Sequence, residues 1–358
     1  MVKYILKKFF YGFLVLFGVI TVIFFLFNVL PGDPATVVLG QRANKEAVEA
    51  INRDLGRDKP LLVQYLMYIN DLSPISFHNS KDRNSAFYLD EQKYSYNFLM
   101  SMDEGACVVA KAPYFRRSYI TKRKVSEIIR ETLPETAVLA FSSILVASFF
   151  GIALGIVAAI KKNTFFDRLA LVLSALGMSA PAFFVGVIIA WLFGFVLADY
   201  TGLNPQGSLF TTDVWEGEQL DLKNLILPTI TLGMRPLAII VQLTRSSLLD
   251  VLSQDYIRTA RAKGLGFYKI IVKHALKNAL NPVITAISGW FAGLMAGAVF
   301  VEIIFNWQGI GYEVYDALTK NDLPVVMGAT LIFATFFILI NIFVDIIYGI
   351  LDPRVRVK

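Results

Sequence analysis

A basic segment at residues 253–282 is the part of this 358-residue sequence best suited to polar chemistry. It contains two closely spaced glycines and a series of cations, Arg258, Arg261, Lys263, Lys269, Lys273 and Lys277. Long apolar runs flank the segment on both sides, so it cannot be a terminal tail. A compact, positively charged segment of this kind can dock into a groove on another protein.

The basic segment is expected to form two short helices joined at Gly264-Leu265-Gly266. Ser253 or Asp255 can accept hydrogen bonds from the free N–H groups of the first turn, and Gly264 can adopt a positive φ at the C-terminal cap. The two glycines can also be no more than punctuation between helices. The second helix begins near residue 267, and one of its faces carries Ile270, Ile271 and His274.

Four polar residues lie inside apolar runs elsewhere in the chain: Arg235, Glu302, Asn341 and Asp345. Polar groups at such depths usually face a bundle interior or a water-filled cavity and find partners there. They are therefore candidates for lining a solute pathway. The alternative is structural pairing between helices, for instance of Arg235 with Asp345.

Several kinds of chemistry have no signature in this sequence. It contains no G-x-x-x-x-G-K-[ST] phosphate loop, no G-x-S-x-G and no H-E-x-x-H. The single cysteine, Cys107, excludes an internal disulfide framework and a cysteine-based metal cluster. We therefore expect no catalytic residue, no metal site and no enzymatic activity in this chain.

The composition places the chain in a lipid bilayer, because 56% of its residues are hydrophobic and these gather in long runs. Each run is long enough to cross the hydrocarbon layer. The six expected spans are residues 9–30, 134–160, 169–197, 225–244, 283–305 and 325–351. The first span is expected to be an uncleaved anchor, with a secretory signal peptide as the alternative.

Positive charges test the orientation of these spans. The segments that an N-inside arrangement places in the cytoplasm are rich in Lys and Arg, whereas the two short outside loops carry only Lys223 and Lys320. The long first outside loop is basic too, but loops of more than about sixty residues largely escape this rule. Both termini and the basic segment are therefore expected to face the cytoplasm, with Cys107 outside. The net charge of +6 then follows from topology and does not indicate nucleic-acid binding.

The order of the spans predicts the domain organisation. Residues 1–30 form an N-terminal anchor, residues 31–132 an extracytoplasmic region, residues 133–352 the membrane core with the basic segment, and residues 353–358 a cytoplasmic tail. Amphipathic helices are expected at residues 45–68, where apolar side chains recur at helical spacing. A small lobe or ordered loop is expected at residues 73–117.

Residues 255–264 resemble the coupling-helix motif of ABC importer permeases, in the form found in the dipeptide/oligopeptide/nickel subfamily. With the motif aligned at Gly264, its Glu-Ala-Ala falls on Arg258-Thr259-Ala260, and its glutamate and proline are absent. Only Ala260, Gly264 and Leu276 agree with the general pattern. The peptide-permease subfamily is similar to this chain in departing from the general motif at the same positions. It also resembles the chain in the stretch His274-Ala275-Leu276.

Four more stretches are similar to the same subfamily, in order along the chain: Tyr4-Ile5-Leu6-Lys7-Lys8, Leu30-Pro31-Gly32-Asp33-Pro34, Lys59-Pro60-Leu61-Leu62-Val63-Gln64-Tyr65 and Leu351-Asp352-Pro353-Arg354. The resemblance implies an all-α integral membrane protein with six transmembrane helices of the type I ABC importer permease fold and a large extracytoplasmic loop after the first helix. Residues 72–114 have no counterpart in the subfamily pattern and are expected to be an insertion.

The resemblance also implies partners. The basic segment would dock into a cleft of an ATP-hydrolysing subunit, and the residues expected to couple are Tyr256, Arg258, Thr259, Ala260, Arg261, Ala262, Lys263, Gly264, Leu265, Gly266 and His274. Two ATPase subunits would bind ATP and Mg, since this chain is expected to hold no cofactor. A second homologous permease subunit and an extracytoplasmic solute-binding protein would complete the importer.

Other classes of protein stay open. A secondary transporter or channel would also show six spans and buried charges, but it has no use for a capped, glycine-broken cytoplasmic hairpin. A membrane-embedded enzyme would need a convergent acid, base or nucleophile, and none is evident. Within the subfamily, the solute can be a short peptide, nickel, glutathione or another small molecule.

Overall fold

The computed structural model describes residues 2–29, 52, 56–83, 85–91, 93–102, 105–213 and 217–351. These residues fall into two compact units. Unit 1 comprises Met1–Phe9, Thr132–Tyr312 and Phe336–Lys358, and unit 2 comprises Phe10–Glu131 and Glu313–Thr335. The helical positions expected at Ala47, Val48, Ile51 and Leu55, and the tail at residues 353–358, lie outside the described residues.

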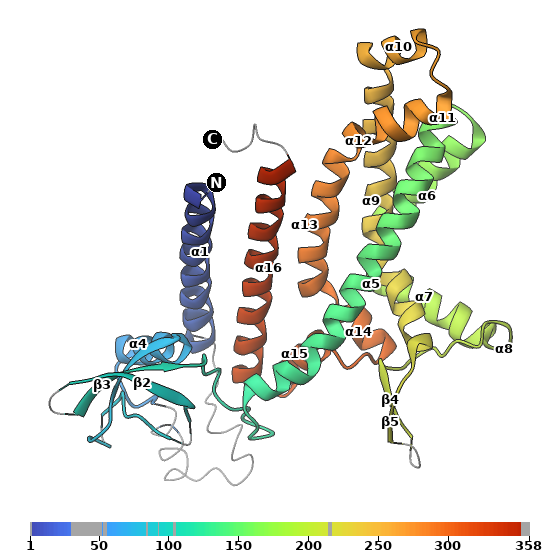
Figure 1. Ribbon diagram of the computed structural model, residues 1–358. Helices are drawn as coiled ribbons and strands as arrows, with labels where there is room; N and C mark the ends of the chain where they lie inside the picture. The colour runs from blue at the N-terminus through green and yellow to red at the C-terminus, as the bar shows by residue number, and fades with distance from the viewer. Residues whose placement is uncertain are drawn as a thin grey trace. The chain divides into compact units, whose positions relative to one another are not determined.

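Four described helices are long and apolar enough to cross a membrane. They are α1 (Val2–Val29), α5 (Val125–Ile160), α9 (Ile226–Leu252) and α16 (Leu323–Leu351) (Figure 1). They match four of the six expected spans. The other two apolar runs form broken pairs of helices, so the described residues contain up to six spans if each pair counts as one.

The expectation of one continuous span at residues 169–197 is wrong. This run forms α6 (Phe165–Ser179) and α7 (Ala182–Trp191), which a π-helical turn, η3 (Leu192–Val196), extends. The two helices meet at a bend of 108°. Pro181 explains the break, because the residue before a proline avoids helical geometry and Ala180 is extended, with ψ of 131°.

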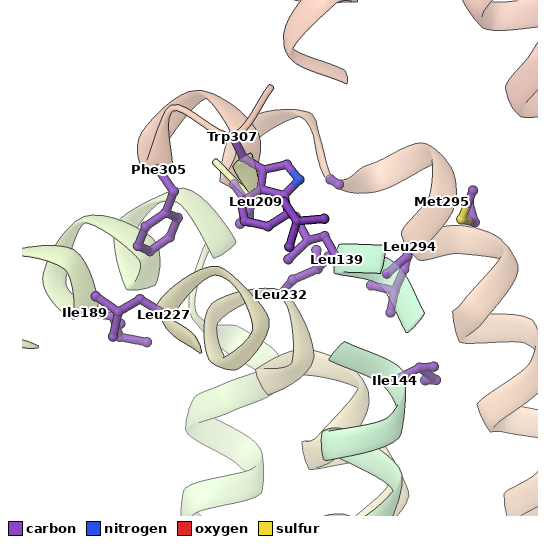
Figure 2. Close-up of a cluster of buried hydrophobic side chains, with 13 residues drawn as sticks. Leu139, Ile144, Ile189, Leu209, Leu227, Leu232, Leu294, Met295, Phe305 and Trp307 are labelled. Carbon is purple, nitrogen blue, oxygen red and sulfur yellow. The ribbon is translucent and has the colours of Figure 1, made fainter. Parts of the chain in front are cut away.

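The core of unit 1 is built from α5, α7, α9, α13 (Asn281–Gly297) and α14 (Val299–Phe305). Its fully buried side chains include Trp307, which Figure 2 shows beside Leu209 and Leu139. Helix α5 approaches the backbone of α9 closely at Gly155, where an added Cβ would lie 2.8 Å from the Val241 carbonyl oxygen.

Unit 2 contains a small lobe with strands, so the all-α expectation is wrong there. Helix α4 (Leu61–Leu72) leads into β1 (Ile75–Asn79), β2 (Tyr96–Ser101) and β3 (Ala106–Lys111), which form an antiparallel sheet in the order β1-β3-β2. In β3, Cys107 and Val109 are buried and alternate with less buried neighbours, as strand geometry requires. Because the strands are short, their alternation gives a weak sequence signal.

Short elements complete the two units. Unit 1 also contains α8 (Ala198–Thr201), the hairpin of β4 (Phe210–Asp213) and β5 (Gly217–Leu220), and the single turn η4 (Leu222–Leu225). Helix α15 (Ile310–Thr319) begins in unit 1 and ends in unit 2.

Candidate functional site

The basic segment forms the two-helix hairpin that the sequence predicts. Helix α10 (Asp255–Ala262) is followed by a turn, and a second helical stretch consists of α11 (Phe267–Lys269), the π-helical turn η5 (Ile270–Ala275) and α12 (Leu276–Ala279). We call residues 255–279 the basic hairpin. It lies at one end of α9 (Figure 1). No sequence pattern predicts the π-helical turn in the second stretch.

Gly264 adopts the positive φ that was predicted for the cap of the first helix. Its φ is +77°, and its N–H donates to the Arg261 carbonyl oxygen at 2.9 Å. An added Cβ would meet no atom within 4 Å, so glycine is favoured here by backbone conformation and not by crowding. Gly266 differs, because its φ of −62° suits any residue.

The expected side-chain cap at the start of the hairpin is wrong. The N-cap residue of α10 is Gln254, and its side chain makes no capping bond. Ser253 is instead the C-cap residue of α9, and its hydroxyl donates to the Asp250 carbonyl oxygen at 2.7 Å. Asp255 lies inside the first turn and faces Arg258 at 3.4 Å. The two helices follow each other too closely for Ser253 to turn toward the second one.

An apolar base holds the basic hairpin on unit 1. Ile257 is fully buried, and it packs with Ala159 at the end of α5 and Leu248 at the end of α9. The other buried members of this base are Ala260, Ile270, Ala275 and Ala279. Burial of this surface stabilises the hairpin as part of the membrane core, so the hairpin is seated on α5 and α9.

The opposite face of the basic hairpin is polar and exposed. Exposed residues include most of those predicted to couple: Tyr256, Arg258, Thr259, Arg261, Ala262, Lys263, Gly264 and Gly266. Leu265 and His274 are half-buried, and Ala260 belongs to the base. Among the described residues, no hydrogen bond or ion pair engages the side chains of Arg261 and Lys263. These cations are free to meet another protein.

Glu302 is fully buried, unlike the cations of the hairpin. Its carboxylate accepts hydrogen bonds from the Thr136 hydroxyl at 2.7 Å, from the Tyr312 backbone N–H at 2.7 Å and from the Gly311 backbone N–H. These donors come from α5 and from the start of α15. The carboxylate therefore joins α14 to α5 and to the start of α15, which favours the structural reading of Glu302 over a pathway role.

A second buried carboxylate supports the same region. Glu135 accepts a hydrogen bond from the Ser208 hydroxyl at 2.9 Å, and its backbone carbonyl accepts one from the Trp307 indole N–H at 3.1 Å. The Ser208 hydroxyl oxygen in turn accepts from the Gln308 backbone N–H at 3.1 Å. We call Glu135, Thr136, Ser208 and Glu302 the buried carboxylate network. It fixes two irregular segments against α5.

The remaining polar residues of the apolar runs do not gather at one place. Asp345 forms an ion pair with Lys8 of α1 at 2.6 Å, so its partner is Lys8 and not Arg235. Asn341 donates to the Phe337 carbonyl oxygen of its own helix at 2.7 Å. Arg235 is exposed beside Pro236 in α9, and among the described residues nothing forms a hydrogen bond or ion pair with it.

Two sequence families match the chain. Residues 151–357 match the family described as binding-protein-dependent transport system inner membrane component, and residues 1–81 match its N-terminal region. The first match covers more than half of the chain and includes the basic hairpin. The chain belongs to this family of binding-protein-dependent permeases. Residues 82–150 lie between the two matched regions.

Individual relatives agree with the family assignment. The chain is 35% identical to the dipeptide transport system permease protein DppB of Alkalihalophilus pseudofirmus, with 96% of each chain covered. It is 34% identical to the di/tripeptide transport system permease protein DppB of Pseudomonas aeruginosa, covering 95% of this chain and 94% of the relative. It is 33% identical to the glutathione transport system permease protein GsiC of Salmonella paratyphi A over both full lengths.

Membership in the permease family has two direct consequences. Permeases of this family are transport components and not enzymes, so the prediction of no enzymatic activity is confirmed. The family description also places the chain in the inner membrane, in agreement with its long apolar helices.

Sequence reasoning missed the residues that hold the site together. Thr136 and Glu135 lie near the start of an apolar run, and Ser208 lies in a connecting segment, so no local pattern marks them as partners of residues around 302–310. The ion pair of Asp167 with Arg245 was missed for the same reason. Only the position of Asp167 in the first turn of α6 hints at a role.

Proposed function

We propose that this chain is a membrane-spanning subunit of an ABC importer that moves short peptides across the cytoplasmic membrane, using ATP hydrolysed by partner subunits. The basic hairpin is the single observation that carries the proposal. Its cations are exposed, whereas the apolar base below them is buried. The cations therefore contribute little to holding the fold together. An exposed and rigidly seated surface of this kind is suited to receive force from a partner.

In the proposed mechanism, the basic hairpin docks into a cleft of an ATPase subunit. ATP binding closes a pair of ATPases, which displaces the hairpins of this chain and of a second permease. Because the base packs on the ends of α5 and α9, such a displacement would move both helices. The cavity between the permeases would then open toward an external solute-binding protein.

Arg235 is the best candidate for a solute contact in this chain. Its side chain is exposed within an apolar helix, whereas Glu302, Asn341 and Asp345 are engaged by residues of unit 1. An unpaired cation at such a depth commonly faces a water-filled cavity. Arg235→Gln is therefore expected to lower transport while the complex still assembles, and loss of assembly would indicate a structural role.

The proposed topology places both termini and the basic hairpin in the cytoplasm and the lobe of unit 2 outside. Cys107 is buried in that lobe, so a membrane-impermeant thiol reagent should label it only after the lobe unfolds. Protease added outside spheroplasts should cut between Lys81 and Lys93. Cleavage there from the cytoplasmic side alone would contradict the topology.

A reconstituted complex tests the function. Uptake of a dipeptide into proteoliposomes is expected to require this chain, a partner permease, an ATPase pair and a binding protein. Collapse of the proton gradient at constant ATP should leave most uptake intact, whereas an inactive ATPase should abolish it. Uptake by this chain alone, driven by an ion gradient, would favour a secondary transporter.

Glutathione is the second candidate solute, because the chain is nearly as similar to glutathione permeases as to dipeptide permeases. Competition experiments on the same complex separate the two. Excess unlabelled dipeptide should reduce labelled dipeptide uptake, and glutathione should do so only if it is also carried. Nickel can be included as a third competitor.

A further inference from the structure

Asp167, which is buried, and Arg245, which is partly exposed, form an ion pair that lies outside the two regions described so far. Arg245 Nε is 2.5 Å from Asp167 Oδ1 and Nη2 is 2.9 Å from Oδ2, so the guanidinium binds both oxygens. Asp167 Oδ2 also accepts the Asn163 backbone N–H at 2.8 Å. Only 3% of the Asp167 side chain is exposed. Separation from Arg245 would leave the buried Asp167 carboxylate uncompensated, which strongly disfavours it.

This ion pair joins three elements next to the basic hairpin. Asn163 lies in the turn between α5 and α6, Asp167 in the first turn of α6, and Arg245 on α9. One helical turn after Arg245 comes Leu248, which belongs to the apolar base of the hairpin. The cytoplasmic ends of the three helices are therefore tied together where the hairpin is seated.

Helices α6 and α9 also contact each other about three helical turns further along α6 and about two turns along α9. A Cβ added at Gly177 of α6 would lie 3.4 Å from the Cβ of Ala238 on α9. Just beyond Gly177, the chain bends by 108° into α7. The two helices are thus held together from the hairpin to the bend.

We propose that α6 and α9 move as one lever, locked by the Asp167–Arg245 pair, and that this lever carries displacement of the basic hairpin to the bend between α6 and α7. Asp167 and Arg245 are positioning residues, since they act through the helices they join. This inference rests on the proposed ATP-driven import. Two outcomes separate the lever from the proposed import. If the wild-type complex shows no ATP-dependent uptake, the proposed import itself is refuted, whereas the lever is tested only by variants of a complex that does show uptake.

The first test uses the complete reconstituted complex. Arg245→Gln should lower transport about tenfold while ATP hydrolysis stimulated by the binding protein stays within about twofold, so that more ATP is used per solute. Arg245→Lys keeps the charge but cannot bind both oxygens, so its transport rate should lie between those of the wild type and Arg245→Gln. Asp167→Asn combined with Arg245→Gln should be no worse than either change alone. Asp316→Asn, which breaks an exposed pair with Lys320, is the matched control.

The second test joins α6 and α9 by a covalent bond. Gly177→Cys with Ala238→Cys should form a disulfide between α6 and α9, because the two Cβ atoms would lie at about the separation a disulfide needs. If the helices move as one lever, oxidised and reduced forms should transport equally, and oxidation should restore transport to Arg245→Gln. Loss of transport on oxidation would overturn the proposal, and so would normal coupling in Arg245→Gln.

Discussion

The basic hairpin and the buried carboxylate network both concentrate charge in unit 1, but they treat it in opposite ways. In the hairpin, apolar side chains such as Ile257 are buried and the cations point outward. In the network, the carboxylate of Glu302 is fully buried and three donors surround it. The first arrangement leaves charge available to a partner, and the second uses charge to hold irregular segments in place.

This difference indicates which charged side chains are able to bind a solute or a partner protein. A buried carboxylate whose hydrogen bonds are all made within the fold cannot bind solute without breaking those bonds. An exposed cation on a rigid base can bind a partner at no such cost. A charge inside an apolar run is therefore a weaker sign of a solute pathway than an exposed charge such as that of Arg235, which has no hydrogen-bond or ion-pair partner within the described part of the chain.

Removal of the Glu302 carboxylate is expected to have the largest effect. Glu302→Ala leaves three buried donors unpaired, each costing about 1–3 kcal/mol, so the complex should lose several kcal/mol of stability. Glu302→Gln keeps one acceptor and should lose less. Thermal unfolding in detergent measures the change, with Asp255→Asn, whose side chain is 94% exposed, as the control. Normal stability with transport abolished would instead make Glu302 a pathway residue.

Truncation of the hairpin base should rank second. Ile257→Ala opens a cavity under the hairpin and should cost about 2–4 kcal/mol, which loosens residues 255–279 locally. Amide hydrogen exchange in that segment should rise and transport should fall. Tyr256→Phe is the matched control for hydrogen exchange alone, because it removes only the exposed hydrogen bond of Tyr256 with Asn278. Unchanged exchange in Ile257→Ala would mean that the base is not what seats the hairpin.

A side chain at Gly264 should have an intermediate effect. Gly264→Val forces a branched residue to a φ of +77° and should cost about 1–3 kcal/mol in the turn. Insertion should be unaffected, while transport and stimulated ATP hydrolysis fall together. Gly266→Ala separates strain from contact, because its φ tolerates a side chain. If both substitutions abolish coupling, the turn is pressed against the ATPase; normal coupled transport in Gly264→Val would contradict the role of the hairpin.

The smallest expected effect is a pH dependence of the stability of the lobe of unit 2, where burial acts on His78. Burial lowers the pKa of His78, and the nearby Lys111 ammonium lowers this pKa further, against the opposing Asp71 carboxylate. Below about pH 6.5 the unfolded lobe then binds a proton that the folded lobe resists, so lobe stability should fall as the pH drops. Proteolysis of the lobe across pH 5.5–7.5 measures this. His78→Gln should flatten the profile, and an unchanged profile would contradict the assignment.

Much of the fold could be read from local signals. Runs of apolar residues identify α1, α5, α9 and α16, because spanning a bilayer requires length and hydrophobicity and little else. The hairpin was predictable for a similar reason, since Gly264 marks a backbone conformation that few other residues adopt. Pro181 also carried a local signal, and the bend it produces could have been anticipated.

Side-chain partners in the candidate site could not be read in the same way. Pairing of Asp345 with Arg235 was one example of the structural alternative, yet Asp345 pairs with Lys8, which lies at the other end of the chain. Hydropathy places such residues at a depth but does not state which helices are neighbours. The strands of the lobe were missed because their short alternating patterns do not stand out from irregular segments.

The sequence by itself determined the class of this protein: an inner-membrane chain with long apolar helices, a basic two-helix hairpin closed by Gly264, and no enzymatic motif. Only the tertiary structure decided which of its charges are free. It seated the hairpin on Ile257, enclosed Glu302 among Thr136, Gly311 and Tyr312, and joined Asp167 to Arg245. The physical reason is that burial and pairing depend on contacts between residues far apart in the chain, whereas helix formation and membrane insertion depend on residues that are near neighbours.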